Sequence, residues 1–325
     1  MINPNEYKTM QRERHGNSRY KMVDMIELEE KNKMLATELM LTRIDNKLSK
    51  GIEPTAFELR FLYEIDEKHF TFEKNIKDPN CSYSSSMYRD WANIIKMRRN
   101  AKADMATIFN CSEDEVYDES SEEEFIDSEN IKVYIGNLTD EDYYPSLEAV
   151  IGDVTCMKEE FDMPFLRYIT GDAMMHSLTS SKNVHFVSVG GNLYAPQLNE
   201  AYDMQNLKYV GGDVNLCNLI KADGLSSLTY IGGDVNFDSL VDARGLSSLT
   251  HTKSFSAPNL KYDEGLNRMK VIDGSAKFNS LEYLYDLNNL YLINGSLTVL
   301  DNYSITDIDI DVTGDIDFSS RTRSR

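Results

Sequence analysis

The stretch from Leu207 to Phe237 reads LKYVGGDVNLCNLIKADGLSSLTYIGGDVNF, so the phrase LKYVGGDVNL returns 21 residues later as LTYIGGDVNF. A glycine of this phrase recurs in steps of 16 to 21 residues, apart from one gap of 41 residues in which Ser254 stands where a glycine is expected. Repetition at such a period is the sequence signature of a solenoid. The recurring glycines are Gly136, Gly152, Gly171, Gly191, Gly212, Gly233, Gly274, Gly295 and Gly314.

Each repeat unit, or coil, carries three apolar positions. A Leu-x-x-Leu step precedes the glycine, a β-branched residue stands directly before it, and apolar residues alternate with polar ones after it. Alternation with period two predicts a strand with one buried face, and strands recurring at this interval must stack in parallel. We therefore expect an α+β protein, in which a helical N-terminal domain precedes a right-handed parallel β-solenoid of about ten leucine-rich coils of 19–21 residues.

The glycine is expected at a corner of each coil. Neighbouring backbones lie about 4.8 Å apart in stacked strands, and a residue without Cβ can take positive φ at a sharp bend there.

The phrase Leu-x-x-Ile-Gly-Gly-Asp-Val-x-Phe, with its Leu-x-x-Leu step, resembles the short leucine-rich repeats of bacterial surface and effector proteins. It also resembles the β-helical L domains of growth-factor receptors. The resemblance covers about residues 131–320 and implies a binding module, because these families share a fold and not a catalytic residue. The common leucine-rich form has an asparagine at the strand-to-turn corner that is missing here, which favours coils without helices.

Residues 1–112 are expected to form a helical domain. One helix is predicted from Ser18 to Lys50, which contains no proline or glycine and ends at Gly51. Thr55 and Glu58 form a capping-box pattern for the next helix. Its expected apolar face comprises Phe57, Phe61, Leu62 and Ile65. Further on, residues 104–116 have the spacing of a helix, a turn and a second capped helix that begins at Glu113.

Charge is distributed unevenly along the chain. Residues 1–112 hold 19 Lys and Arg against 17 Asp and Glu, whereas residues 113–325 hold 15 against 37, a net charge of −22. Ten acids fall within residues 113–129, so residues 113–130 are predicted to be an acidic linker; residues 321–325, RTRSR, form a basic tail. An acidic surface repels phosphate backbones, which disfavours direct nucleic-acid binding and favours a protein partner with a basic surface.

Compartment signals point to a cytoplasmic protein. Its four cysteines have neither disulfide nor zinc spacing, and the sequence contains no leader-like segment and no apolar run long enough to enter a membrane. We expect no membrane contact and no cofactor. The oligomeric state stays open.

The candidate binding surface is the outward face of the strands that follow the glycines. Stacked carboxylates on this face could be screened by solvent, bonded to corner amides, or neutralised by a cation such as calcium. The coil that lacks the glycine has either simply drifted in sequence or is the place where a ligand docks. Phe255 is expected on the exposed face of this coil, and exposed aromatics often anchor interfaces. The candidate partner-binding residues are Met174, Tyr194, Asp213, Asn215, Asp234, Asn236 and Phe255.

Enzyme activity is not expected. The five histidines are isolated, and neither a Gly-x-Ser-x-Gly motif nor a phosphate-binding loop is present. Two main functions remain, besides a third class, a surface or particle structural protein, which would show regular self-association in solution. The first is a non-enzymatic protein-binding module or scaffold that uses the exposed strand face. The alternative is an inhibitor encoded by a phage or mobile element, such as an anti-CRISPR or similar anti-defence protein, which would occupy a basic nucleic-acid-binding channel.

Overall fold

The computed structural model describes residues 28, 31–69, 94, 100–121, 128–141, 143–282, 286–300 and 310–319. The chain divides into two compact units, with the boundary between Val116 and Tyr117. Each unit is considered by itself below. The basic tail at 321–325 and the first part of the helix predicted from Ser18 lie outside the described residues.

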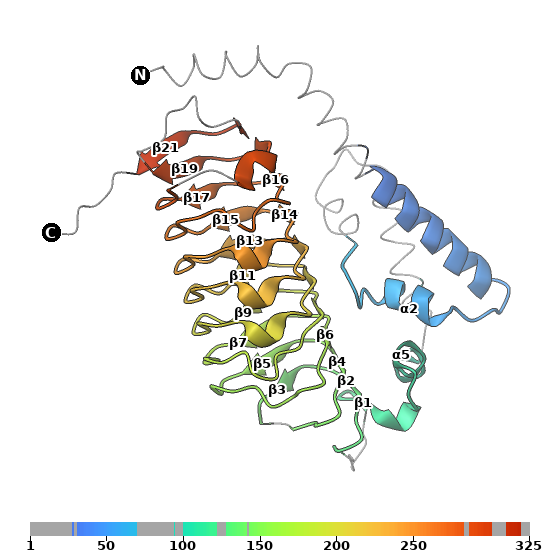
Figure 1. The fold of residues 1–325 in the computed structure, drawn as a ribbon. Coiled ribbons are helices and arrows are strands. Elements are labelled where there is room, and N and C mark those ends of the chain that lie inside the picture. Colours follow the sequence, from blue (N-terminus) through green and yellow to red (C-terminus); the bar gives the residue numbers. More distant parts are fainter. Residues whose placement is uncertain are drawn as a thin grey trace. The chain divides into compact units, whose positions relative to one another are not determined.

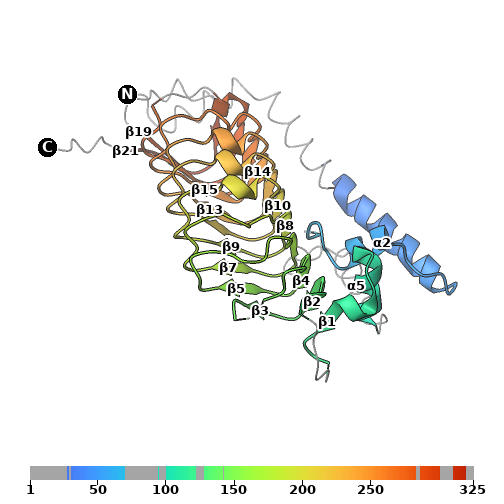
Figure 2. The ribbon, with the colours of Figure 1, turned by 60° about the horizontal axis from the view of Figure 1, so that its bottom comes forward.

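The C-terminal unit is a parallel β-solenoid, as the sequence predicts (Figure 1). Its strands form one sheet of 11 strands and a second of 10, which agrees with the expected number of coils. From β2 onward the neighbours in both sheets pair in parallel. From β2 onward, successive strands of the chain alternate between the two sheets (Figure 2).

The first sheet comprises β1 (Val116–Asp118), β2 (Val133–Ile135), β4 (Ala149–Ile151), β6 (Tyr168–Ile169), β8 (Ser188–Val189), β10 (Tyr209–Val210), β12 (Tyr230–Ile231), β14 (His251–Thr252), β16 (Val271–Ile272), β18 (Leu292–Ile293) and β20 (Asp311–Val312). The second sheet comprises β3 (Leu138–Thr139), β5 (Val154–Cys156), β7 (Ala173–Met175), β9 (Leu193–Tyr194), β11 (Val214–Asn215), β13 (Asp234–Asn236), β15 (Ser254–Ser256), β17 (Ala276–Phe278), β19 (Leu297–Leu300) and β21 (Ile316–Ser319).

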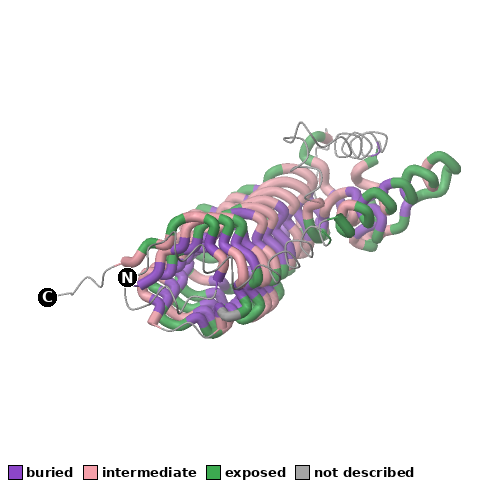
Figure 3. Tube along the Cα trace, turned by 90° about the horizontal axis from the view of Figure 1, so that it is seen from above, coloured by how far each residue is buried: buried purple, intermediate pink, exposed green. Residues whose placement is uncertain are grey.

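The three predicted apolar positions build one continuous core. In the coil around Gly212, the first sheet contributes Val210, the second contributes Val214, and the connecting turn contributes Leu207, all of them buried. Buried segments line the inside of the coils along the stack (Figure 3). The turns contain short 3₁₀ helices: η2 (Tyr202–Met204), η3 (Asp223–Leu225), η4 (Arg244–Leu246) and η5 (Asp286–Asn289).

The corner glycines are required for close approach, and the predicted reason, positive φ, is wrong for most of them. Among the corner glycines only Gly136 and Gly152 have positive φ. A Cβ added to Gly212 would lie 2.3 Å from Oδ1 of Asn192 and 2.9 Å from the carbonyl carbon of Gly191, both in the preceding coil. No side chain fits in that space.

The solenoid begins inside the segment that we expected to be an acidic linker. Val116–Asp118 form β1, at the edge of the first sheet, and the amide of Glu119 donates to the carbonyl of Ile135 over 2.9 Å. The helix predicted from Glu113 is only a single 3₁₀ turn, η1 (Glu113–Glu115). Val116 and Tyr117 favour an extended backbone, and pairing with β2 provides this extended segment with a neighbouring strand. Residues 122–127 of the expected linker lie outside the described residues.

The N-terminal unit is helical in its described parts. A helix covers residues 31–48, and α2 (Ala56–Leu62) and α5 (Ala101–Phe109) follow. The first helix ends before Gly51, which has φ of +67°, and Thr55 caps α2 with the predicted capping box. The Tyr63 hydroxyl donates to Oδ2 of Asp104 over 2.7 Å and ties the end of α2 to α5.

One part of the prediction for α2 is wrong. Leu62 and Ile65 are buried as expected, but Phe57 is 66 % exposed and Glu58 takes the inward position. Glu58 accepts a hydrogen bond from Lys47 Nζ over 2.7 Å and lies 2.9 Å from Nε of Arg43. Two cations of the preceding helix therefore hold a buried carboxylate, which an apolar-periodicity argument does not detect.

Candidate functional site

The second sheet presents one outward side chain from each coil, and these form a row. We call this set the outer row. Its members are Thr139, Thr155, Met174, Tyr194, Asn215, Asn236, Ser256, Lys277, Thr298 and Asp317, which strand pairing places side by side. Four of the seven predicted binding residues are consecutive members: Met174, Tyr194, Asn215 and Asn236. Strand spacing of about 4.8 Å makes this four-residue segment roughly 14 Å long.

The N-terminal end of this segment is apolar. Met174 and Tyr194 are half-buried neighbours in register, and the Tyr194 ring lies 5.3 Å from the imidazole of His176. The sequence analysis did not connect His176 with this surface. The position of His176 in the sequence, two residues after Met174, could have indicated this connection, because parallel strand register places His176 beside the following coil.

The C-terminal end of the segment offers amide donors. Oδ1 of Asn215 accepts the backbone amide of Cys217 over 3.3 Å, and Oδ1 of Asn236 accepts that of Asp238 over 3.1 Å. These local turns orient both side chains, since only the oxygen of each amide group can accept. The Nδ2 atom of each asparagine therefore remains as a hydrogen-bond donor on this face.

Asp213 and Asp234 lie at the corner and belong to a different arrangement. There the side-chain oxygen of each coil accepts the backbone amide of the corresponding residue in the next coil. We call this the corner ladder. It runs unbroken through Glu119, Asn137, Asp153, Asp172, Asn192, Asp213 and Asp234, with donor–acceptor distances of 2.6–3.1 Å. Of the three alternatives for these stacked side chains, the structure thus shows bonding to corner amides.

The corner ladder also explains the glycines, because each Asx side chain occupies the space beside the glycine of the next coil. In the described part of the chain, no group of three or more His, Cys, Asp or Glu side chains could hold a metal ion.

Two substitutions at Asp213 test the ladder. Asp213→Asn keeps the oxygen that accepts from Asp234 and removes a charge from an acidic surface, so we expect unchanged or slightly higher stability. Asp213→Ala leaves the Asp234 amide without this acceptor and should cost about 1 kcal/mol. Urea unfolding measures both, with and without a calcium chelator. A loss with Asn equal to that with Ala, or a fall caused by the chelator, would contradict the ladder in favour of a cation.

Phe255 is not on the surface, so its predicted exposure is wrong. Its ring is 1 % exposed and packs between Phe237 and Phe278, with centroid distances of 5.9 and 5.6 Å. Lys253 and Ser254 replace the three residues Gly-Gly-Asx of other coils, so strand pairing sets Phe255 beside buried Val235. This one-residue deletion moves Ser256 to the outer row.

The same coil interrupts the corner ladder. Lys253 Nζ lies 3.3 Å from Oδ2 of Asp234, and the ladder resumes with serines, since Oγ of Ser275 accepts the amide of Ser296 over 3.1 Å.

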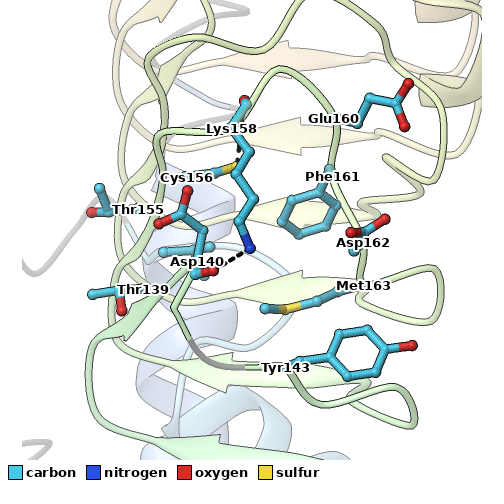
Figure 4. Close-up of a pocket in the computed structure, with 11 residues that line it drawn as sticks. Thr139, Asp140, Tyr143, Thr155, Cys156, Lys158, Glu160, Phe161, Asp162 and Met163 are labelled. Atoms are coloured by element: carbon cyan, nitrogen blue, oxygen red, sulfur yellow. Dashed lines mark hydrogen bonds between the residues drawn. The ribbon is translucent and has the colours of Figure 1, made fainter.

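A shallow pocket lies over the first coils of the second sheet, between Asp140, Tyr143, Cys156, Lys158 and Phe161 (Figure 4). Lys158 Nζ donates to the backbone carbonyl of Asp140. Burial raises the pKa of the Cys156 thiol, and the hydrogen bond to the backbone carbonyl of Lys158 does not offset this rise. A thiol held protonated is a poor nucleophile, so this pocket lends no support to covalent catalysis.

Comparison of the chain with protein families, with curated proteins and with solved structures found no match. Among the described residues, no helix has both the length and the apolar character needed to cross a membrane.

Proposed function

We propose that this chain is a non-enzymatic protein-binding module, which binds its partner through the outer row from Met174 to Asn236. The observation that carries the proposal is a cluster on an outward face, where Met174 and Tyr194 are neighbours in register and the Tyr194 ring lies 5.3 Å from the His176 imidazole. A solenoid does not need apolar side chains outside its core, and clusters of this kind are common in interfaces.

The chemistry of the row indicates the partner. Tyr194 and Met174 fit an apolar or aromatic side chain, while Nδ2 of Asn215 and of Asn236 fits a carbonyl or another acceptor. Along the corner, Asp213 and Asp234 are exposed. One oxygen of Asp213 accepts the Asp234 amide, and Oδ2 of Asp234 lies 3.3 Å from Lys253 Nζ. A protein segment that carries one apolar side chain beside basic ones fits all three features.

Two further lines support the proposal. The resemblance to leucine-rich repeats points to binding modules by analogy alone. The described cysteines Cys111, Cys156 and Cys217 are free thiols, which is compatible with a cytoplasmic location, and we include that location in the proposal.

Site-specific photo-crosslinking tests the surface. A photoreactive residue at Tyr194 should capture a partner in the native host, and one at Thr298, in the same row five coils further on, should not. Met174→Asp should abolish capture from position 194, because it places a charge in the apolar contact. The matched control is Thr298→Asp, which should not affect it. Equal capture from both positions, or capture that survives Met174→Asp, rejects this surface.

The inhibitor alternative is supported by one observation, the net charge of −22 over residues 113–325. It predicts that binding to the captured partner weakens steeply with added salt and competes with DNA or RNA. An apolar contact at Met174 and Tyr194 predicts neither. Titration of the purified complex at low and high salt, with nucleic acid as competitor, separates the two functions.

A further inference from the structure

The helix at residues 31–48 has two apolar faces, and only one of them is covered by the N-terminal unit. Leu41 and Ile44 are buried on the inner face. Leu28, Leu35 and Leu39 are 56 %, 53 % and 62 % exposed. At about 100° per residue these three leucines fall within roughly 40° of one another, on the side of the helix turned away from Leu41. We call them the leucine stripe.

The polar residues that continue the stripe follow a heptad. With Leu35 at position d and Leu39 at position a, Leu28 is another d, Thr42 is a d, and Asn32 and Asn46 are both a positions. All of the polar members are exposed. Asparagine at a is the feature that fixes register and two-chain assembly in parallel coiled coils, where each asparagine faces its own copy.

The flanking charges are complementary to a second copy of the same helix. In a parallel, in-register pair, a residue at g faces the residue five positions further along in the partner helix. Glu38 would then face Arg43 of a second copy, and Asp45 would face Lys50. The N-terminal 112 residues carry a net charge of only +2, so their surfaces do not repel one another as the acidic solenoid does.

We propose that two copies of this chain associate through the leucine stripe as a short parallel coiled coil. Three leucines per chain make a small contact, and two asparagine layers weaken it further, so the dimer should be reversible and dissociate on the order of 10–100 µM.

Sedimentation equilibrium of the full chain, from about 5 to about 300 µM, measures the association. Leu35→Glu/Leu39→Glu should weaken it by at least about 100-fold, because four apolar side chains per dimer become charged. The matched control is Ile52→Glu/Phe57→Glu, which makes the same charge change at two residues of the same unit that are 51 % and 66 % exposed. The control should associate like the wild type. A chain that stays monomeric throughout, or a dimer that both pairs of substitutions affect equally, overturns the proposal.

Disulfide trapping tests the register independently of stability. Asn32→Cys should form a disulfide-linked dimer on mild oxidation, because position 32 faces itself in the parallel pair. Lys33→Cys, turned by about 100° on the helix, should give no more than the wild-type background set by the chain's own cysteines. Equal trapping at both positions, or trapping at neither, excludes the parallel coiled coil.

Discussion

Replacing Gly224 with alanine is expected to lower the free energy of unfolding of the solenoid by about 3 kcal/mol or more. A Cβ at this position would lie 1.5 Å from the carbonyl oxygen of Ala201 and 2.2 Å from its carbonyl carbon, in the coil before. Both atoms belong to the backbone, so no rotamer change can relieve the clash. Gly245 stands in the same relation to Ala222, at 1.6 Å, and should behave alike.

Gly274→Ala is the matched control. The atom nearest to a Cβ there is the hydroxyl oxygen of Ser254, at 2.4 Å, which can rotate away. The closest backbone atom is the carbonyl oxygen of Lys253, at 2.9 Å, so a smaller loss is expected. Urea unfolding followed by circular dichroism compares the three variants. If Gly224→Ala is no more destabilising than Gly274→Ala, close stacking of the 3₁₀ turns does not determine stability.

The second large effect is acid sensitivity of the N-terminal unit, which should lose stability as pH falls from about 4.5 to about 2. Burial alone would raise the pKa of Glu58, but hydrogen bonds from Lys47 and Thr55 outweigh it and lower the pKa to about 2. Glu58 thus binds a proton more readily in the unfolded chain, where its pKa is about 4.5. The ionised Glu58 side chain therefore contributes fully to the free energy of unfolding above pH 4.5. This contribution, up to about 3 kcal/mol, disappears as pH approaches 2.

Glu58→Gln identifies the responsible group. The variant should be less stable than the wild type at neutral pH and equally stable near pH 2, where the wild-type carboxyl is protonated as well. Glu67→Gln removes an exposed carboxylate of the same unit and should leave the pH profile unchanged. Helical circular dichroism of the full chain during urea unfolding, repeated across this pH range, provides the measurement. A constant difference between Glu58→Gln and the wild type at every pH would assign the acid sensitivity to other groups.

Periodicity was enough to predict the solenoid, because every coil repeats the same demands on the same positions. Val210 is buried at the β-branched position before the glycines and Val214 is buried where alternation places it, and the row from Met174 to Asn236 is in the predicted register. The predictions that failed concern local departures from the repeat. A single deleted residue at Lys253 and Ser254 turns Phe255 inward, and a deletion can be placed only when the strand partners are known.

Charge placement was equally hard to predict. Glu58 has the residue type of a surface position, yet Lys47 and Arg43 make burial acceptable, and both come from another helix. At the corner, the sequence left three explanations for the stacked acids, since only the direction of each side chain distinguishes an amide acceptor from a cation ligand. The leucine stripe was visible as residues, but only the structure shows that Leu28, Leu35 and Leu39 stay exposed.

The hydrogen bonds of the corner ladder all run in the same direction along the solenoid. Each coil accepts from the next and donates to the one before, and the links from Asn192 to Asp213 and from Asp213 to Asp234 both span 21 residues. A duplicated coil of this length would meet the same acceptor below it and offer the same acceptor above. Gene duplication could therefore lengthen such a protein one coil at a time without redesign of its interior.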